Sequence, residues 1–204
     1  MTPRHRIVVL ISGSGSNLQA LLDTPDLPGE VVLVLSDRPG VFGLERAARA
    51  GVASSVVALA DHPDRATWEA ALTDRVAQAA PDLVVLAGFM KILSGDFVRR
   101  WPTVNVHPSL LPAFSGAHAP ADALAWGVKV SGVTVHFVDE QVDHGPIIAQ
   151  QAVTVEPTDT VESLHARIQA VEHTLLPQAV RSICLGLVQV EGRRVILKDP
   201  HRNS

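Results

Sequence analysis

The sequence predicts an α/β protein built on an open, mostly parallel, twisted sheet with helices on both faces. Strand-length apolar runs alternate with amphipathic stretches through the first half of the chain, which is the order of strand–helix–strand units. Several of these runs are almost continuous Val, Leu and Ile, as in parallel strands that are buried on both faces. With 204 residues, 47% of them hydrophobic, the chain is long enough for one core, and we expect a single domain over residues 1–204.

The expected elements of the first half follow from these two patterns. Asp64 and Ser94 are suited to cap helices at their N-termini, and Gly51 is suited to follow a helix C-terminus. Right-handed crossovers would bring the carboxyl ends of the parallel strands to one edge of the sheet. The strands are expected at residues 7–12, 31–36, 54–59, 83–88 and 103–107, and the helices at residues 17–23, 42–50, 64–79 and 94–100.

The second half of the chain has a different pattern. The stretch LPAFSGAHAPA predicts a loop, because it is rich in Pro, Gly and Ala. Residues 131–138 and 147–155 predict an antiparallel hairpin at the sheet edge, joined through the short polar segment 139–145. Beyond it we expect a long C-terminal helix at residues 159–183, which could break near Pro177, and a last hairpin in LVQVEGRRVILK.

Composition excludes several classes of partner. The net charge is −4, so no basic surface is expected for DNA or long RNA. No apolar stretch approaches the roughly 20 residues of a membrane-spanning helix, and the N-terminal sequence lacks the cleavage site of a signal peptide. The one cysteine, Cys184, cannot form a disulfide within the chain and is expected to be buried. We expect a cytoplasmic protein that acts on small molecules, without nucleic acid or membrane.

The loop SGSGSN (12–17) follows the first expected strand and opens the first expected helix. It does not fit G-x-G-x-x-G, because Leu18 stands at the third glycine position, and no Gly-Lys follows as in a P-loop. Its glycines allow close approach of the backbone, while Ser16, Asn17 and the helix N-terminus offer donors to an anion. A phosphate monoester fits this loop better than a dinucleotide does. The alternative is a plain strand-to-helix turn.

Asn105 and His107 end the fifth expected strand, in the segment NVHPSLLP (105–112). Two residues apart on a strand, they point to the same face, near the sheet edge at which open α/β sheets bind ligands. Pro108 and Pro112 stiffen the segment that follows. An amide and a protonated imidazole that donate to one point would stabilise an oxyanion, and the histidine could also pass a proton to a leaving group.

A carboxylate would stabilise a protonated histidine at this position. The loop DEQVDHG supplies Asp139, Glu140 and Asp143, of which Asp143, next to a His-Gly-Pro turn, is slightly favoured to point inward. No compelling nucleophile is evident, which indicates direct attack by a substrate group on a carbonyl carbon.

The nine histidines do not indicate a metal site. His107, His118, His136 and His144 could cluster, but no pair has the spacing of helical ligands, and neither an H-E-x-x-H motif nor a cysteine joins them. We therefore expect no metal. His136 alternates with apolar neighbours, so it faces either the site or a structural partner.

Five segments together resemble the phosphoribosylglycinamide formyltransferase family, folate-dependent enzymes of purine synthesis. The likeness runs in order from about residue 6 to about residue 180. It implies a Rossmann-like formyltransferase fold with a nucleotide-substrate half at about 6–110 and a folate and catalytic-loop half at about 111–190. The segments are VVLISGSGSNLQAL, LVVLAGFMKIL, NVHPSLLP, GVTVHFVDEQVDHGPII and VEHTLLP.

The resemblance also implies a reaction and the roles of individual residues. The formyl group of 10-formyltetrahydrofolate, a co-substrate, would pass to the amine of 5-phosphoribosylglycinamide. Asn105 matches the oxyanion donor, His107 the general acid, and Asp143 the carboxylate that polarises the histidine and holds a water. The other matches are Gly15, Ser16 and Asn17 for the substrate phosphate, Glu172 for the substrate ribose, and Arg65, Met90, Lys91, Ile92, Leu93 and Asn105 for the folate.

Some positions depart from the family pattern. Ser115-Gly116 stands where many relatives have Pro-Gly, and Ala121 lies where a basic residue is common, so the loop contacts to substrate would differ. His144 replaces the small residue that commonly follows the aspartate, next to the expected water. Lys91 stands where some members have Arg.

Two alternatives compete with this interpretation. A formyltetrahydrofolate hydrolase or a methionyl-tRNA formyltransferase would typically carry a further regulatory or RNA-binding domain, which we do not expect in these 204 residues. A non-catalytic nucleotide-binding module would explain the glycine loop but not the amide, imidazole and carboxylate in this order. A homodimer is a possible assembly, formed through an apolar hairpin or sheet edge.

Overall fold

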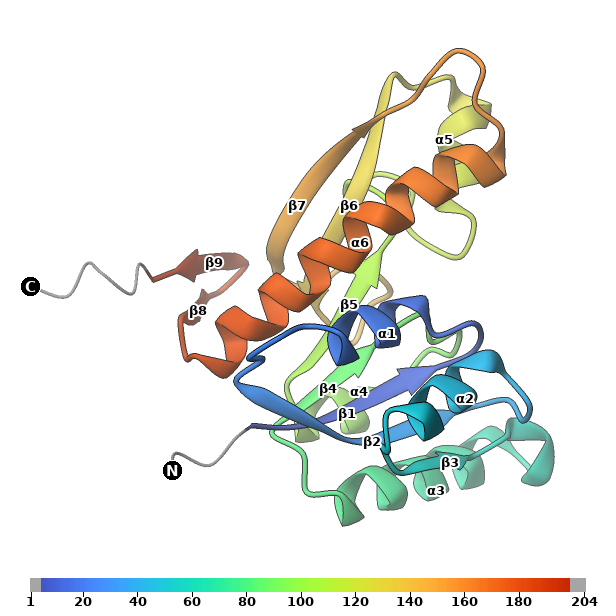
Figure 1. Cartoon of the computed structure of the whole chain (residues 1–204), viewed down its shortest axis with the longest axis vertical. Coiled ribbons are helices and arrows are strands. Elements are labelled where there is room, and N and C mark those ends of the chain that lie inside the picture. Colours follow the sequence, from blue (N-terminus) through green and yellow to red (C-terminus); the bar gives the residue numbers. More distant parts are fainter. Residues whose placement is uncertain (1–4, 199–204) are drawn as a thin grey trace, which may run out of the picture. The chain divides into compact units, whose positions relative to one another are not determined.

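The computed structural model describes residues 5–198 and contains a seven-stranded, mostly parallel sheet with helices, as predicted (Figure 1). The hydrogen-bonded strand order is β3-β2-β1-β4-β5-β6-β7, and β8 and β9 form a separate two-stranded sheet. The strands are β1 His5–Ile11, β2 Gly29–Ser36, β3 Ser54–Val56, β4 Leu83–Leu86, β5 Thr103–His107, β6 Val130–Phe137, β7 Ile147–Thr154, β8 Val188–Glu191 and β9 Arg194–Leu197. The helices are α1 Ser16–Leu22, α2 Phe42–Arg49, α3 Arg65–Gln78, α4 Gly95–Arg100, α5 Ala119–Trp126 and α6 Val161–Cys184, with a short 3₁₀ helix at Leu59–Asp61.

Two compact units make up the described chain, with the division between Val104 and Asn105, inside β5. The first unit contains β1–β4 and α1–α4, and the second contains α5, α6 and β6–β9. That the two halves form one domain stays a prediction.

In the first unit, β1 lies between β2 and β4 and pairs with both in parallel. Its residues Ile7–Ile11 are fully buried, as the continuous apolar run predicts. The crossovers from β1 to β2 and from β2 to β3 run one way along the sheet, whereas the crossover from β3 to β4 runs the other way. Right-handed crossovers therefore place α1 and α2 on one face and α3 on the other.

The helix ends of the first unit confirm the predicted capping residues. Asp64 caps α3 by accepting a hydrogen bond from the Thr67 N–H at 2.7 Å, and Ser94 caps α4 by accepting one from the Phe97 N–H at 3.3 Å. Gly51 follows α2 with a φ of 71°, the left-handed conformation in which a glycine commonly ends a helix.

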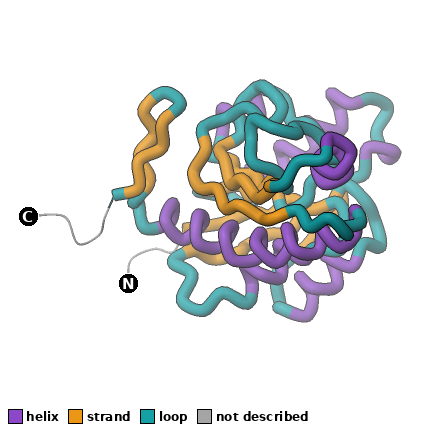
Figure 2. The backbone as a smooth tube through the Cα atoms, turned by 90° about the horizontal axis from the view of Figure 1, so that it is seen from above, coloured by secondary structure: helices purple, strands orange, loops and turns teal. Residues whose placement is uncertain are grey.

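In the second unit, β6 and β7 pair antiparallel and β7 is the edge strand, as predicted. Helix α6 contacts both strands, and Figures 1 and 2 show it running alongside them. Pro177 lies inside α6, which is one continuous helix as expected, and the alternative of a break at this proline does not occur. Its neighbours Leu175, Leu176 and Ala179 are buried, and this apolar burial offsets the hydrogen bond that proline removes from the helix.

One segment of the second unit differs from the prediction. The Pro-, Gly- and Ala-rich stretch 111–121 is predicted to be a loop, but helix α5 begins at Ala119. Pro120 lies in the first turn of α5, where the backbone N–H has no helical acceptor, so it favours the helix start instead of preventing it. Gly127, with a φ of 69°, ends α5.

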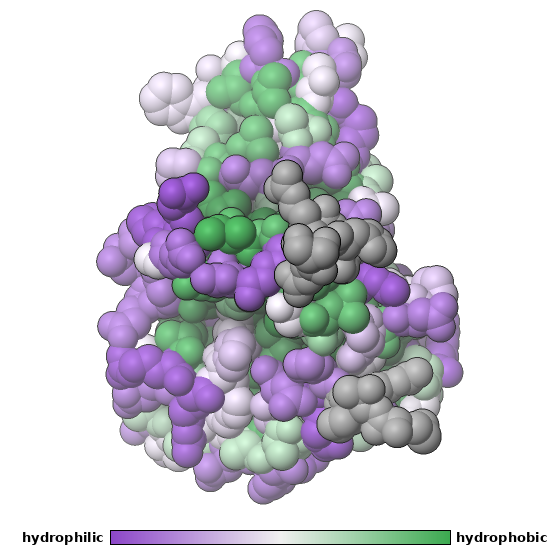
Figure 3. Space-filling model, turned by 90° about the vertical axis from the view of Figure 1, so that its left-hand side faces the viewer, coloured by the Kyte–Doolittle hydropathy of each residue, from purple (hydrophilic) through white to green (hydrophobic). Residues whose placement is uncertain are grey.

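The surface combines polar and apolar side chains. Figure 3 shows green, hydrophobic areas among purple, hydrophilic ones on one face of the molecule. The exposed apolar side chains include Trp126, Val190 and Leu197, whereas Cys184 is buried, as predicted. No helix within residues 5–198 is long and apolar enough to cross a bilayer.

Trp68 anchors α3 in the core of the first unit. Its side chain is fully buried, and its indole N–H donates a hydrogen bond to the Val57 carbonyl at 2.8 Å. Its ring also stacks on Phe89, with the ring centroids 6.5 Å apart. The helix is therefore held by apolar burial and by one buried polar contact.

Replacing Trp68 by Phe should lower the free energy of unfolding by about 1–3 kcal/mol, because the Val57 carbonyl would lose its buried donor. Urea unfolding followed by circular dichroism measures this. The matched control is Trp126→Phe, since Trp126 is 80% exposed and its replacement should change the stability by less than about 0.5 kcal/mol. Equal unfolding midpoints for the two variants would contradict the assigned role of Trp68.

Candidate active site

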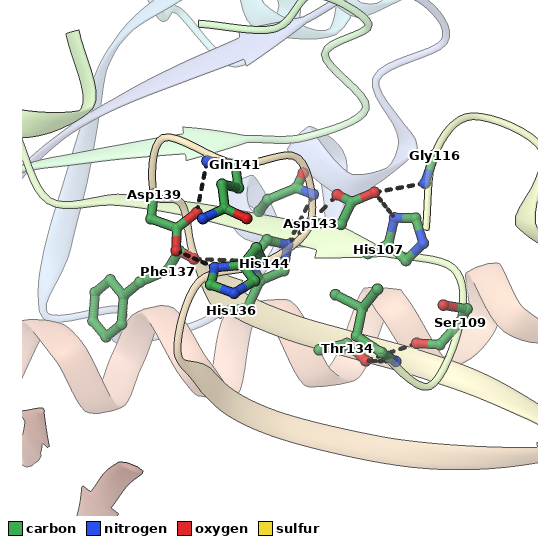
Figure 4. A network of polar contacts seen from close by, with 12 residues as sticks. His107, Ser109, Gly116, Thr134, His136, Phe137, Asp139, Gln141, Asp143 and His144 are labelled. Atoms are coloured by element: carbon green, nitrogen blue, oxygen red, sulfur yellow. Dashed lines mark hydrogen bonds and ion pairs between the residues drawn. The ribbon is translucent and has the colours of Figure 1, made fainter. Parts of the chain in front are cut away.

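The second unit brings together a histidine and a carboxylate that are far apart in the sequence. Asn105 and His107 lie two residues apart on β5, and Asp143 lies in the loop between β6 and β7. His107 Nδ1 is 3.4 Å from Asp143 Oδ2, and Figure 4 shows the two side chains pointing toward one another. The arrangement matches the pairing that the sequence predicts.

The ring of His107 is buried and held on both sides. His107 is 4% exposed. Its Nε2 donates a hydrogen bond to the Phe114 carbonyl at 2.8 Å, and its Nδ1 faces Asp143. Both partners accept hydrogen bonds, so a ring protonated on both nitrogens could donate to both of them. These contacts define the orientation of the imidazole.

Asp143 is held by the backbone as well as by the histidine. Its Oδ2 accepts a hydrogen bond from the Gly116 N–H at 2.7 Å, and its φ of 52° lies in the left-handed region, which is uncommon for a residue with a side chain. Two residues further, a Cβ on Gly145 would lie 1.9 Å from the Phe137 carbonyl oxygen, so only glycine fits there. The conformation that directs Asp143 toward His107 therefore depends on its neighbours in the loop.

The structure shows which of the three carboxylates in this loop contacts His107, a choice for which the sequence favoured Asp143 only slightly. Asp139 Oδ2 accepts a hydrogen bond from His144 Nδ1 at 2.7 Å. Burial raises the pKa of Asp139, but the hydrogen bond from His144 and further contacts outweigh burial and lower that pKa overall. Glu140 is exposed. Of the three, Asp143 is the one that pairs with the histidine at the end of β5.

Asn105 contacts a histidine of the neighbouring strand β6. Its Nδ2 lies 3.3 Å from His136 Nε2, and His136 Nδ1 lies 2.8 Å from the Phe137 carbonyl. A carbonyl only accepts hydrogen bonds, so Nδ1 carries the proton and Nε2 accepts from the amide of Asn105. Burial is the main cause that lowers the pKa of His136, which is 1% exposed. His136 therefore fits the role of a neutral ring that orients the amide.

In the first unit, the loop SGSGSN (12–17) lies close to the start of α2. Gly15 has a φ of 70°, and a Cβ there would lie 2.6 Å from the Cα of Gly43. The Gly43 N–H also donates to the Gly13 carbonyl at 3.1 Å. The close approach of the two segments requires glycine, which explains the composition of the loop.

An arginine of α2 braces the same loop. Arg46 Nε donates to the Ser14 carbonyl at 2.9 Å, and Nη1 donates to Gln19 Oε1 at 3.0 Å. Ser16 and Asn17 begin α1, and the Asn17 side chain is buried. A guanidinium therefore lies beside a glycine loop that carries polar side chains.

The predicted folate residues of the first unit contact that loop and one another. The Met90 N–H donates to Ser12 Oγ at 2.8 Å, and the Ser12 N–H donates to the Gly88 carbonyl at 3.2 Å. Arg65 at the start of α3 donates to the Ile92 carbonyl. The side chains of Met90 and Ile92 are apolar but exposed, at 60% and 61%. Exposed apolar groups beside fixed polar groups are typical of a ligand site.

Lys91 pairs with a carboxylate that the sequence pattern did not single out. Its Nζ lies 3.5 Å from Oδ2 of Asp37, which follows β2 and whose side chain is 1% exposed. Neither carboxylate oxygen of Asp37 has a hydrogen-bond partner among residues 5–198. The buried charge is therefore compensated by cations, Lys91 and the more distant Arg38 at 3.9 Å. Leu93, at the end of the same loop, is buried.

The remaining candidates lie in the second unit. Glu172 is a buried carboxylate on α6, 5% exposed. Ser115 and His118 lie in the loop whose sequence is expected to depart from the family pattern, and both are exposed. Ala121 is part of α5. In the described part of the chain, no three His, Cys, Asp or Glu side chains are grouped to hold a metal ion.

Two residues near these sites were missed by sequence reasoning. Asp37 directly follows a strand at the sheet edge where ligands bind, and that position was the available signal. Arg46 shares α2 with Arg49, and no local pattern tells which of the two contacts the glycine loop.

Comparison with known proteins relates the whole arrangement to one family. Residues 5–180 match the formyl transferase family. The chain is 51% identical over 192 residues to a phosphoribosylglycinamide formyltransferase of Mycobacterium tuberculosis, covering 92% of this chain and 89% of that protein. It is 50% identical over 190 residues to the trifunctional purine biosynthetic protein adenosine-3 of Drosophila melanogaster, covering 90% of this chain but only 14% of that protein.

Solved structures of similar proteins also match this chain. Glycinamide ribonucleotide transformylase 1 from Symbiobacterium toebii matches with a TM-score of 0.94 and 49% identity, covering 98% of this chain and 96% of that one. Phosphoribosylglycinamide formyltransferase from Coxiella burnetii matches with a TM-score of 0.90 and 36% identity, covering 96% and 94%. Fold and sequence are therefore shared along nearly the whole chain.

His136 should make the stability depend on pH. Its pKa is lowered in the folded protein and returns to about 6.5 on unfolding, so below pH 6.5 the unfolded chain binds more protons than the folded one. The free energy of unfolding should therefore be highest above pH 6.5 and decrease as the pH falls toward the folded-state pKa, by at most about 1.4 kcal/mol per pH unit.

Urea unfolding at about pH 8 and about pH 5.5 measures this dependence in the wild type and in His136→Gln. In His136→Gln, the free energy of unfolding should decrease less between these two pH values than in the wild type. In His165→Gln, which removes an exposed histidine of α6, it should decrease as much as in the wild type. Identical profiles for the wild type and His136→Gln would show that the ring does not contribute.

Proposed function

We propose, since this chain belongs to the formyl transferase family, that it transfers the formyl group of 10-formyltetrahydrofolate to the amine of 5-phosphoribosylglycinamide. The products are formylglycinamide ribonucleotide and tetrahydrofolate, in de novo purine biosynthesis. The observation that carries the proposal is the pairing of His107 with Asp143, beside an amide donor two residues earlier on the same strand.

The reaction joins a nitrogen nucleophile to a formyl carbon. The lone pair of the substrate amine forms the new C–N bond while the carbonyl electrons move onto oxygen, which gives a tetrahedral oxyanion. Asn105 and a protonated His107 are the donors to that oxygen, and for this the Nε2–H of His107 turns from the Phe114 carbonyl to the oxyanion while Nδ1 stays with Asp143. When the oxyanion collapses, the bond between carbon and folate N10 breaks, and the proton lost by the amine ends on N10 as tetrahydrofolate leaves.

Asp143 and His136 have supporting roles in this proposal. Asp143, which is itself held by the Gly116 N–H, orients the ring of His107 and holds the water through which the amine proton is relayed. His136 accepts one N–H of the Asn105 amide, which leaves the second N–H for the oxyanion.

The binding residues are assigned from the match with the family pattern and from their surroundings. The glycine loop, braced by Arg46, would receive the substrate phosphate, and the buried carboxylate of α6 would receive the ribose hydroxyls. The exposed apolar side chains after β4 would contact the folate. The assigned residues are Gly15, Ser16 and Asn17 for phosphate, Glu172 for ribose, and Arg65, Met90, Lys91, Ile92, Leu93 and Asn105 for folate.

This function is limited to formyl transfer between small molecules. Because the chain spans 14–19% of the trifunctional relatives that it matches, their other activities are not part of the proposal. The proposed steps require no metal. A cytoplasmic location, a homodimer and the absence of nucleic-acid and membrane partners stay predictions.

Replacing either member of the histidine–carboxylate pair should remove most of the activity while the fold is kept. We expect His107→Ala and Asp143→Asn each to lower kcat by about 10²–10³, because a positioned oxyanion donor and proton donor contributes about this much. Turnover of glycinamide ribonucleotide with 10-formyltetrahydrofolate, followed by folate absorbance, measures the loss.

The exposed His165 supplies the control, and His165→Ala should keep wild-type turnover. Circular dichroism and thermal unfolding establish that the variants are folded. Near wild-type turnover in His107→Ala and Asp143→Asn would rule out the mechanism. Tight binding of both substrates without any turnover by the wild type would favour a binding module instead.

A further inference from the structure

The C-terminal hairpin β8–β9 contacts the loop that carries Asp143. The hairpin forms a two-stranded sheet of its own, which Figures 1 and 2 show beyond the C-terminal end of α6. Two strands alone are only marginally stable in water, so the hairpin depends on contacts with the rest of the unit. Strand β9 contacts β7, and the turn between β8 and β9 places Arg193 against His144.

Arg193 holds His144 through its backbone and its ring. Nη2 donates to the His144 carbonyl at 2.7 Å, and Nη1 lies 3.0 Å from Nε2 of the same residue. Nδ1 of the His144 ring, which lies 3.3 Å from Arg193 Nη1, donates to Asp139 Oδ2 at 2.7 Å. The guanidinium of Arg193, the imidazole of His144 and the carboxylate of Asp139 therefore lie in contact one after the other.

This chain of contacts acts on the part of the loop that determines where Asp143 points. Asp139 lies four residues before Asp143 in the sequence, and His144 directly follows it, so both ends of the turn are held. The φ of Asp143, 52°, is one that a residue with a side chain adopts only when its surroundings stabilise it. Gly145 packs against the Phe137 carbonyl and leaves the loop no freedom to shift in that direction.

We propose that Arg193 is a positioning residue for formyl transfer: through His144 and Asp139 it holds the loop that directs Asp143 toward His107. The inference rests on the proposed function and extends it, because it gives the C-terminal hairpin a part in catalysis. It also gives a role to His144.

The exposure of the side chains around Arg193 indicates how much its removal should lower kcat. The side chains of His144 and Asp139 are 44% and 35% exposed, and contacts between exposed charged groups are weak. Removing Arg193 should therefore loosen the loop without unfolding the unit. We expect a decrease in kcat of about three- to tenfold, well below the loss on removing Asp143 itself.

The experiment compares Arg193→Ala with Arg194→Ala in the full chain. Arg194 is the next residue of the hairpin, is also exposed and makes none of these contacts, so both variants remove one positive charge from the same place. Hydrogen exchange of residues 139–146 reports the order of the loop independently of activity. Steady-state kinetics gives kcat and KM separately, and Arg193→Lys tests whether a cation with fewer donors restores part of the rate.

We expect Arg193→Ala to increase exchange in residues 139–146 and to lower kcat with less than about a twofold change in KM. Arg194→Ala should do neither, and Arg193→Lys should lie in between. Combining Arg193→Ala with His144→Ala should lower kcat by less than the product of the two separate effects, because either change removes the contact between the guanidinium and the His144 ring.

Equal exchange in the two alanine variants, or faster exchange in Arg193→Ala with unchanged kcat, would overturn the proposal. If the wild type itself transferred no formyl group, the proposed function would fail. The exchange comparison would then still decide whether Arg193 holds the loop.

Discussion

The contact between Asp143 and His107 is the interaction on which the active-site geometry depends. The two residues come from different elements, the β6–β7 loop and strand β5, so their distance of 3.4 Å exists only when the antiparallel hairpin is in register. Gly116 adds a backbone N–H to the same carboxylate oxygen. Three segments therefore meet at one carboxylate, and a shift in any of them would separate the acid from its histidine.

The two histidines near this contact are buried, so their hydrogen-bond partners matter for stability and for their roles. His107 and His136 are 4% and 1% exposed, and a buried polar group without a partner is costly, so each ring nitrogen has a defined contact. The two rings differ in what surrounds them. His107 faces a carboxylate and a carbonyl, whereas His136 accepts from the amide of Asn105. Similar side chains on adjacent strands thus suit different tasks, one in proton transfer and one in orientation.

Much of this could be predicted from the sequence, because the relevant signals are local. Continuous apolar runs predict the buried parallel strands, and Asp64 and Ser94 are recognisable caps. The i, i+2 spacing of Asn105 and His107 places both on one face of β5. Helix α5 was missed because proline was taken as a loop signal, although at a first turn it is compatible with a helix.

Other contacts could not be predicted, since they join residues that no local pattern relates. Lys91 and Asp37 meet only because the strands of the first unit are ordered as they are, and Arg193 meets His144 only because the separate C-terminal hairpin packs near β7. The spacing of residues along the sequence determines neither the order of the strands nor the packing of the hairpin. The selection of Asp143 over Asp139 depends likewise on a single left-handed residue in the loop.

The most direct test is a crystal structure with glycinamide ribonucleotide and a folate analogue whose carbonyl cannot be transferred. We predict that its carbonyl oxygen lies within about 3.2 Å of a donor nitrogen of Asn105 and of His107, with Asp143 still bound to the Gly116 N–H. An oxygen that meets neither donor, or a carboxylate turned away from the imidazole while both ligands are bound, would contradict the account.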